Sequence, residues 1–147
     1  MNGPGFDAFA DQLAAASADL KAIANSFIAA NDGVDKRADD RLMAPARATL
    51  TAWLAGAVRT CLHNPDPRFP QPVYSATYCP DLVVCAQCIL LLMARTNAVE
   101  EFRCDQCGHQ CTGEVEDMIC PGLLQLAAFG WIVGVCVPCR DTLPALQ

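Results

Sequence analysis

Apolar residues in the first part of the chain recur at alternating spacings of three and four positions. This spacing is typical of one long helix with a single apolar seam, because it keeps the side chains on one face. Alanine fills much of the remaining segment, and Asn31-Asp32-Gly33 has the residue types that end a helix. The seam consists of Phe6, Phe9, Leu13, Ala16, Leu20, Ile23 and Phe27.

A second helix is expected to begin near Pro45, because proline is tolerated in the first turn of a helix. Residues 35–43 between the two helices are compatible with either a loop or a short helix. Residues 1–57 are therefore predicted to form an αα-hairpin. Two such helices make a thin core, so the apolar edge has to pack either on the rest of the chain or on a second copy. The apolar face of the second helix would carry Leu50, Trp53, Leu54, Ala57 and Val58.

Beyond residue 60 the pattern changes to two similar stretches, residues 78–92 and 129–143. Each begins with a turn signal and continues with a run of β-branched and other apolar residues, a C-x-x-C pair and a helical start. A further pair of potential metal ligands precedes each stretch. The repeat predicts two tandem units, each with a β-hairpin followed by a helix.

Cysteine is the residue type that most restricts the interpretation, with ten in a chain of 147 residues, all at or after Cys61. Residues 1–7 have neither the basic start nor the apolar core of a secretion signal, and no apolar run reaches membrane-spanning length. We therefore expect a cytoplasmic protein, in whose reducing surroundings cysteines bind metal rather than form disulfides. The candidate ligand pairs are Cys85/Cys88, Cys104/Cys107 and Cys136/Cys139, with Cys61/His63 as a looser fourth pair.

Two ways of combining these pairs are open. Zn²⁺ takes four nitrogen or sulfur ligands in a tetrahedron, so four pairs supply two ions. Cys85/Cys88 with Cys104/Cys107 would have the C-x2-C-x15-C-x2-C spacing of a single zinc ribbon. The sequence repeat favours the other arrangement, in which each C-x-x-C at a helix start joins the pair upstream of its own hairpin.

This order of knuckle, β-hairpin and C-x-x-C at a helix start resembles the treble-clef class of zinc modules. The resemblance implies an α+β fold in which two small zinc modules, residues 58–100 and 101–147, follow the helical hairpin. The first knuckle, C-x-H, departs from the C-x-x-C that the class usually has. The resemblance assigns one zinc ion to Cys61, His63, Cys85 and Cys88, and a second to Cys104, Cys107, Cys136 and Cys139.

The same resemblance places the two hairpins. The first would pair Val73–Ala76 with residues 82–84 around Cys79-Pro80-Asp81. The second would pair residues 123–128 with residues 131–135 around Phe129-Gly130.

Four potential ligands remain outside these two sets. A third site could use His109, Cys111 and Cys120, which lie close together in the sequence, but no adequate fourth ligand is evident. In the alternative interpretation, Cys79 and Cys120 are small buried apolar residues near the hairpins, and His109 lies on a loop.

Catalysis is not indicated. A catalytic zinc keeps one coordination position open, whereas both expected sites are closed by four ligands. No H-E-x-x-H motif, nucleophile elbow or phosphate loop is present. Residues 82–89 locally imitate a thioredoxin-type strand, C-x-x-C and helix, but the further βαβ elements of that fold are missing. Dithiol chemistry and an iron–sulfur cluster on the same thiolates are therefore secondary alternatives.

Charge disfavours nucleic acid as the partner. The chain has a formal charge of −6, and residues 104–147 carry one Arg against five acidic residues. A nucleic-acid-binding ribbon would offer the rings of Tyr74, Tyr78, Phe129 and Trp131 without basic neighbours. The sequence instead predicts a non-enzymatic adaptor or regulator, stabilised by two zinc ions, that binds another protein and forms a homodimer through its N-terminal helices.

Overall fold

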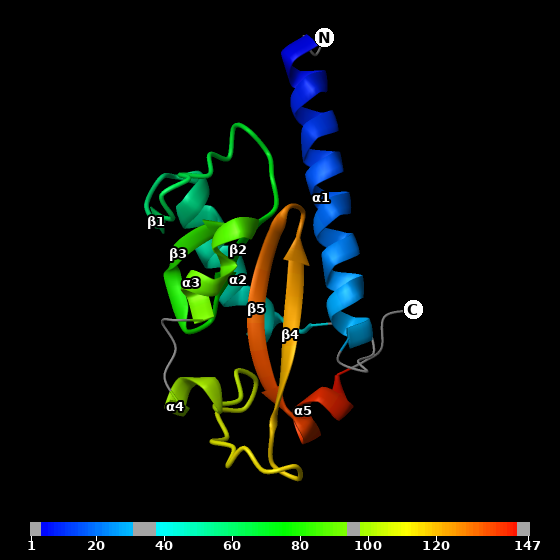
Figure 1. The fold of residues 1–147 in the computed structure, drawn as a ribbon, viewed down its shortest axis with the longest axis vertical. Helices are drawn as coiled ribbons and strands as arrows, with labels where there is room; N and C mark the ends of the chain where they lie inside the picture. The colour runs from blue at the N-terminus through cyan, green and yellow to red at the C-terminus, as the bar shows by residue number, and fades with distance from the viewer. Residues whose placement is uncertain (1–3, 31–37, 94–97, 144–147) are drawn as a thin grey trace.

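The computed structural model describes residues 4–30, 38–93 and 98–143 and shows a mixed α+β fold, with a long N-terminal helix beside a small sheet (Figure 1). The first third of the chain contains α1 (Pro4–Ala30) and α2 (Asp40–Leu54). The remaining elements are β1 (Arg59–Thr60), β2 (Val73–Ala76), β3 (Cys79–Cys85), the 3₁₀ turn η1 (Ala86–Cys88), α3 (Ile89–Met93), α4 (Ala98–Glu101), β4 (Ile119–Leu126), β5 (Phe129–Cys136) and α5 (Val137–Thr142). Among the described residues, no helix combines the length and the apolar character needed to cross a bilayer.

One five-stranded sheet joins the two parts of the chain that were expected to be separate zinc modules. Its strand order is β1-β3-β2-β5-β4. The antiparallel pairs β2–β3 and β4–β5 are the two expected hairpins, and β2 pairs in parallel with β5 from Val73↔Phe129 to Ala76↔Ile132. The division into two separate domains, residues 58–100 and 101–147, remains a prediction.

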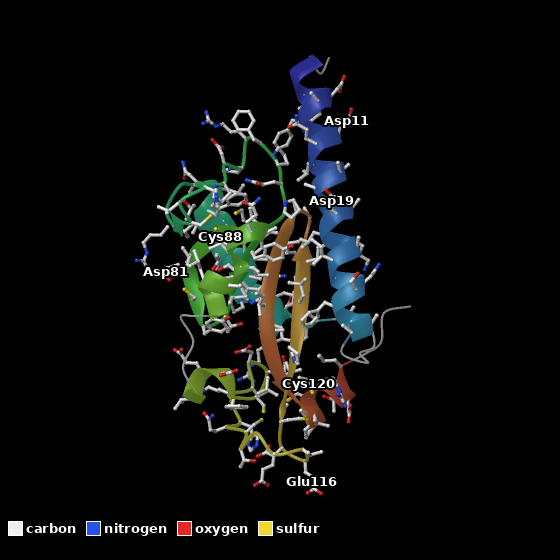
Figure 2. All side chains as sticks on the ribbon, in the orientation of Figure 1. Asp11, Asp19, Asp81, Cys88, Glu116 and Cys120 are labelled. Carbon is white, nitrogen blue, oxygen red and sulfur yellow. The ribbon has the colours of Figure 1, made fainter. Side chains whose placement is uncertain are left out.

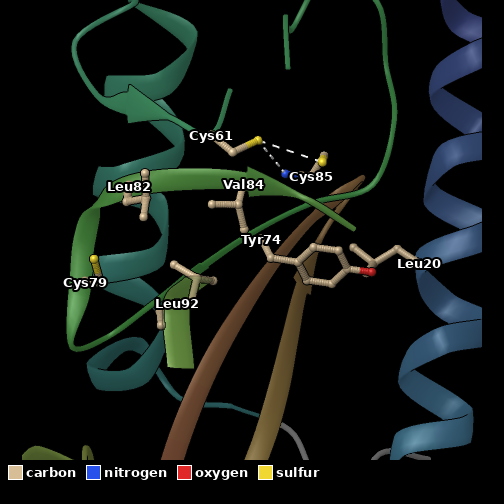
Figure 3. Close-up of a cluster of buried hydrophobic side chains, with 9 residues drawn as sticks. Leu20, Cys61, Tyr74, Cys79, Leu82, Val84, Cys85 and Leu92 are labelled. Carbon is tan, nitrogen blue, oxygen red and sulfur yellow. Dashed lines mark hydrogen bonds between the residues drawn. The ribbon is translucent and has the colours of Figure 1, made fainter. Parts of the chain in front are cut away.

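The two long helices cover opposite faces of this sheet. Leu20 of α1 packs with Tyr74 and Val84 on one face, where Tyr74 is directed at Leu20 (Figure 3). Ala46 and Trp53 of α2 pack with the strand residues that alternate with these, on the other face. The expectation that the two helices form an αα-hairpin is therefore wrong for the described residues, because the sheet lies between them.

The apolar seam of α1 is used only in part by the sheet. Ala16, Leu20 and Ala24 are buried, and the side-chain amide of Gln125 in β4 donates to the carbonyl of Ser17 at 2.8 Å. By contrast, the seam residues Phe6, Phe9 and Ile23 are 57%, 38% and 42% exposed. The middle of the seam thus packs on the protein's own sheet. The predicted stop at Asn31-Asp32-Gly33 lies outside the described residues.

Helix α2 begins five residues earlier than expected, at Asp40 instead of Pro45. The carboxylate of Asp39 accepts a hydrogen bond from the Leu42 amide and caps the helix, which places Pro45 inside it. The predicted apolar face is also partly wrong, because Leu54 is 59% exposed and the helix ends before Ala57. The buried face consists of Leu42, Ala46, Thr49 and Trp53.

Both hairpins turn two residues or more earlier than predicted. In the first, Cys79-Pro80-Asp81 begins β3 and does not form the turn. In the second, Ala127 takes a left-handed φ of 53° between β4 and β5, while Phe129-Gly130 belongs to β5. Gly130 serves close packing: a Cβ at this position would lie 2.9 Å from Cδ1 of Tyr74.

Candidate metal centres

Site 1 consists of Cys61, His63, Cys85 and Cys88, whose ligand atoms all lie within 4.8 Å of one another. The sulfur atoms of Cys61 and Cys85 are 3.8 Å apart. Nδ1 of His63 lies 3.2 Å from the sulfur of Cys88 and 3.4 Å from that of Cys85. The structure therefore brings together the four residues that the treble-clef resemblance grouped first.

Short-range backbone geometry positions the site 1 ligands. Strand β1 pairs in parallel with β3, and the amide of Cys61 donates to the carbonyl of Val83 at 3.3 Å, which sets Cys61 beside Cys85 (Figure 3). The chain then reverses at Asn64, which takes a φ of 47° and donates its amide to the Cys61 carbonyl. This turn brings the imidazole of His63 close to the sulfur atoms of Cys85 and Cys88. On the other side, Cys85 ends β3 and Cys88 ends the turn η1.

The thiols of site 1 do not ionise equally on their own. Burial raises the pKa of the Cys61 thiol, but the amides of Cys85 and His63 outweigh this effect and bring the pKa down to about 7. Burial and the neighbouring thiols of Cys85 and Cys61 raise the pKa of Cys88 to about 11. A cation bound among these donors would offset the repulsion between neighbouring thiolates, because it lowers the pKa of every thiol that it contacts.

Site 2 consists of Cys104, Cys107, Cys136 and Cys139, again with all ligand atoms within 4.8 Å. The sulfur atoms of Cys107 and Cys136 are 3.8 Å apart. Cys136 ends β5 and Cys139 lies in α5, so this C-x-x-C opens a helix as the sequence repeat predicted. Figure 2 shows Cys88 of site 1 and Cys120, which pairs with Val135 next to site 2, in different halves of the molecule.

A pair of reciprocal hydrogen bonds fixes the knuckle of site 2 against β5. The amide of Asp105 donates to the carbonyl of Gly134 at 2.8 Å, and the amide of Gly134 donates to the Asp105 carboxylate at 2.7 Å. Within the knuckle, the amide of Cys107 donates to the sulfur of Cys104 at 3.5 Å. Gly108 follows with a φ of 80°, a left-handed conformation that favours glycine.

Electrostatics in site 2 repeat those of site 1. Burial raises the pKa of the Cys104 thiol, but the amides of Cys136, Cys107 and Gln106 bring it down to about 7. Burial and the neighbouring thiols raise the pKa of Cys139 well above its usual range. In each site the pKa of one thiol, Cys61 or Cys104, is thus lowered to about 7. The pKa of another, Cys88 or Cys139, is raised, so a nearby cation is needed for it to be a thiolate at neutral pH.

Both groups are geometrically suitable for a metal ion. In a tetrahedral zinc site with Zn–S bonds of about 2.3 Å, sulfur ligands lie about 3.8 Å apart, and sulfur and nitrogen ligands about 3.5 Å apart. The sulfur–sulfur distances of 3.8 Å in the two sites match this edge. The sulfur–nitrogen distances of 3.2 and 3.4 Å in site 1 are slightly shorter.

The leftover cysteines are not part of either group. Cys79 is buried, and its thiol lies 3.7 Å from the Asp81 carboxylate. Cys120 is half-buried, and its sulfur accepts a hydrogen bond from the Arg140 guanidinium at 3.5 Å.

A third group of ligand atoms does occur, but it contains Asp117 and not Cys120. His109, Cys111 and Asp117 have their ligand atoms within 4.8 Å of one another. Asp117 was missed because it belongs to the charged residues 114–117, which resemble a solvent-facing loop in the sequence. The H-x-C spacing was the only sequence signal that pointed here.

Comparisons with known proteins give no relative for this chain. No family model matches it, and no match was found among curated proteins or among solved structures.

Proposed function

We propose that this chain is a non-enzymatic protein with one structural Zn²⁺ in each of sites 1 and 2, and that it acts by binding another protein. The observation that carries the proposal is the convergence of four nitrogen and sulfur donors at each of two places. Such closed, sulfur-rich sets of four suit tetrahedral zinc. Knuckle, hairpin and helix follow one another in both parts of the chain, which supports treble-clef-type modules.

The alternatives that use the same thiolates are less favoured. Iron–sulfur clusters are held mostly by four cysteine thiolates, whereas site 1 contains His63. A dithiol oxidoreductase would need Cys85 and Cys88 for redox chemistry, but both lie within ligand distance of Cys61 and His63. A closed donor set also leaves no position for a substrate, which supports a structural role.

Nucleic-acid binding is the remaining alternative, and the burial of the aromatic residues argues against it. Stacking on bases requires exposed rings. Tyr74, Phe129 and Trp131, three of the four rings that this alternative would use, are each 1% exposed.

Exposed apolar residues on α1 support an interaction with protein. Phe6 and Phe9 lie in the first turns of α1, which extend past the β4–β5 turn in Figure 1. Removing a phenylalanine side chain from water contributes about 1.5–3 kcal/mol. We propose that a second copy covers these turns, so that the chain is a homodimer.

Metal analysis with native mass spectrometry tests the zinc proposal. Purified, colourless protein is expected to retain two zinc ions per chain in a mild chelator. His63→Ala should lose the ion of site 1, and His63→Cys should keep it, because a thiolate restores the fourth ligand. Stoichiometric iron with strong visible absorption would reject zinc in favour of a cluster.

Analytical ultracentrifugation tests self-association. A substitution in the middle of the seam, such as Leu20→Asp, would not test self-association, because Leu20 is fully buried against the protein's own sheet and the change would disturb the fold. The double variant Phe6→Ser/Phe9→Ser is expected to be monomeric with both zinc ions bound. Val99→Ser, which removes another exposed apolar side chain, should remain dimeric. A wild-type protein that sediments as a monomer at high micromolar concentration would reject the dimer.

A further inference from the structure

His109, Cys111 and Asp117 form a group of three different donors outside sites 1 and 2. Nε2 of His109 lies 2.9 Å from Oδ1 of Asp117, and the sulfur of Cys111 lies within 4.8 Å of both ligand atoms. Cys111 is buried, whereas the side chains of His109 and Asp117 are 51% and 33% exposed. The group thus has a buried end at the thiol and an open end at the imidazole.

The loop that carries the group is held in place by its own backbone. The amide of Cys111 donates to the carbonyl of Phe102 at 2.8 Å, which fixes the thiol against the core. The amide of Thr112 donates to Oδ2 of Asp117 at 2.9 Å, so that Oδ1 faces His109. Gly113, with a φ of 89°, donates to the carbonyl of Asp117 and closes the turn. The three donors therefore converge before any ion is added.

We propose that these three side chains form a third metal site, which binds Zn²⁺ or a similar divalent transition metal through Sγ, Nε2 and Oδ1. A thiolate, an imidazole and a carboxylate together suit borderline cations such as zinc, whereas Mg²⁺ and Ca²⁺ require oxygen ligands. Three protein ligands leave the fourth position of a tetrahedron to water. The exposed side of His109 gives water access to this position.

The contact between His109 and Asp117 needs only a small adjustment to accept the ion. In a tetrahedral site with bonds of about 2.0–2.1 Å, a nitrogen and an oxygen ligand lie about 3.3 Å apart. The contact of 2.9 Å between His109 and Asp117 would therefore open by a few tenths of an ångström. The imidazole of His109 is 51% exposed, which leaves its ring free on the solvent side to adjust.

A simple hydrogen-bonded pair between His109 and Asp117 is the competing explanation, and it predicts no third ion. The two explanations differ in metal stoichiometry. Protein that holds its chelator-resistant ions is titrated with Co²⁺, and bound cobalt is followed by its thiolate charge-transfer and ligand-field absorption and by native mass spectrometry. A third ion, bound more weakly than the first two, is expected in the wild-type protein.

The variants change the more exposed ligands His109 and Asp117, because a substitution of the buried Cys111 would also disturb the core. His109→Ala and Asp117→Asn are each expected to weaken the third ion at least about tenfold, because even outer-shell partners of metal ligands are worth about 10- to 100-fold in affinity. Glu116→Gln is the matched control, because the exposed Glu116 lies in the turn between the bridged residues Glu114 and Asp117, at the lower end of the molecule in Figure 2, and is not one of the three donors. This variant should bind cobalt as the wild type does.

Two results would overturn the proposal: a wild-type protein that takes up no ion at this place, or a His109→Ala variant that takes it up equally well. Failure of the zinc proposal for sites 1 and 2 is distinguishable. It would appear as missing chelator-resistant ions before any cobalt is added, and the variants at His109 and Asp117 would not affect it.

Discussion

Gly130 determines how closely the two hairpins approach each other. It pairs with Tyr74 across the parallel strands β2 and β5. A Cβ here would lie 2.9 Å from Cδ1 of Tyr74 and 3.2 Å from Cδ1 of Leu123. Tyr74 is 1% exposed and packed in the core, so a shift of its ring would disturb its buried neighbours. The absence of a side chain at Gly130 is therefore what allows this ring to lie over the joint between the hairpins.

Gly130→Ala is accordingly expected to destabilise the protein by about 1–3 kcal/mol, the usual cost of overpacking a core. Thermal or urea unfolding would measure this change. Gly5→Ala is the matched control, because a Cβ on Gly5 in α1 meets nothing within 4 Å. It should leave stability unchanged or raise it by up to about 1 kcal/mol, since alanine favours the helix. Equal effects of the two substitutions would contradict the role given to Gly130.

At the scale of elements, Asp39 connects α2 to the knuckle of site 2. One carboxylate oxygen caps α2 through the Leu42 amide at 3.2 Å, and the other accepts from the Gln106 side-chain amide at 2.6 Å. The hydrogen bond from Gln106 lowers the pKa of Asp39. Gln106 lies between the ligands Cys104 and Cys107, so the start of a helix and a metal loop share one side chain.

Asp39→Ala is expected to cost about 1 kcal/mol in the free energy of unfolding, the typical value of a lost N-cap. Asp39→Asn should cost less, because its carbonyl oxygen can still cap the helix. Chemical denaturation monitored by circular dichroism would measure both. Asp40→Ala is the control, since Asp40 is exposed and its side chain forms a surface ion pair with Arg47, which contributes little to stability. A larger loss in Asp40→Ala than in Asp39→Ala would refute this assignment.

The elements differ in how well the sequence predicted them. The α+β class, the two hairpins and the opening of a helix by Cys136/Cys139 were predictable, because each depends on local periodicity or on ligand spacing. The packing of α1 was not, because a 3-4 seam fits a partner helix and a sheet equally well. Gly130 was mistaken for a turn residue because a requirement for close packing leaves no local signal. Asp117 was missed because its partners become neighbours only in the folded loop.

At the scale of the whole molecule, the two candidate metal sites lie at the ends of hairpins that share one sheet. Their ligand sets are nevertheless distinct, since neither group contains a residue of the other. Loss of one ion should therefore affect its own hairpin first.

Cys136→Ser tests this independence. We expect Cys104 and Cys107 to become reactive toward iodoacetamide, while one zinc ion stays bound and the thiols of site 1 remain protected. Mass spectrometry of the alkylated peptides reads both results. In Cys120→Ser, a change outside both groups, all seven ligand cysteines should remain protected. Alkylation of Cys85 and Cys88 in Cys136→Ser would instead indicate a cross-braced arrangement, in which these two cysteines share a metal ion with Cys136.

The parallel pairing of β2 with β5 also constrains the order of events during synthesis. Thr77, next to β2, donates its amide and its hydroxyl to the carbonyl of Ile132, 55 residues further along the chain. A ribosome that adds about 5–20 residues each second releases the first hairpin seconds before its partner. During that interval the edge of β2 that later pairs with β5 is free and is a template for aggregation, while the hairpin is ordered by its packing on α1 and α2 and by the ligands of site 1. Scarcity of zinc during translation should therefore produce more aggregate than removal of zinc from the finished protein.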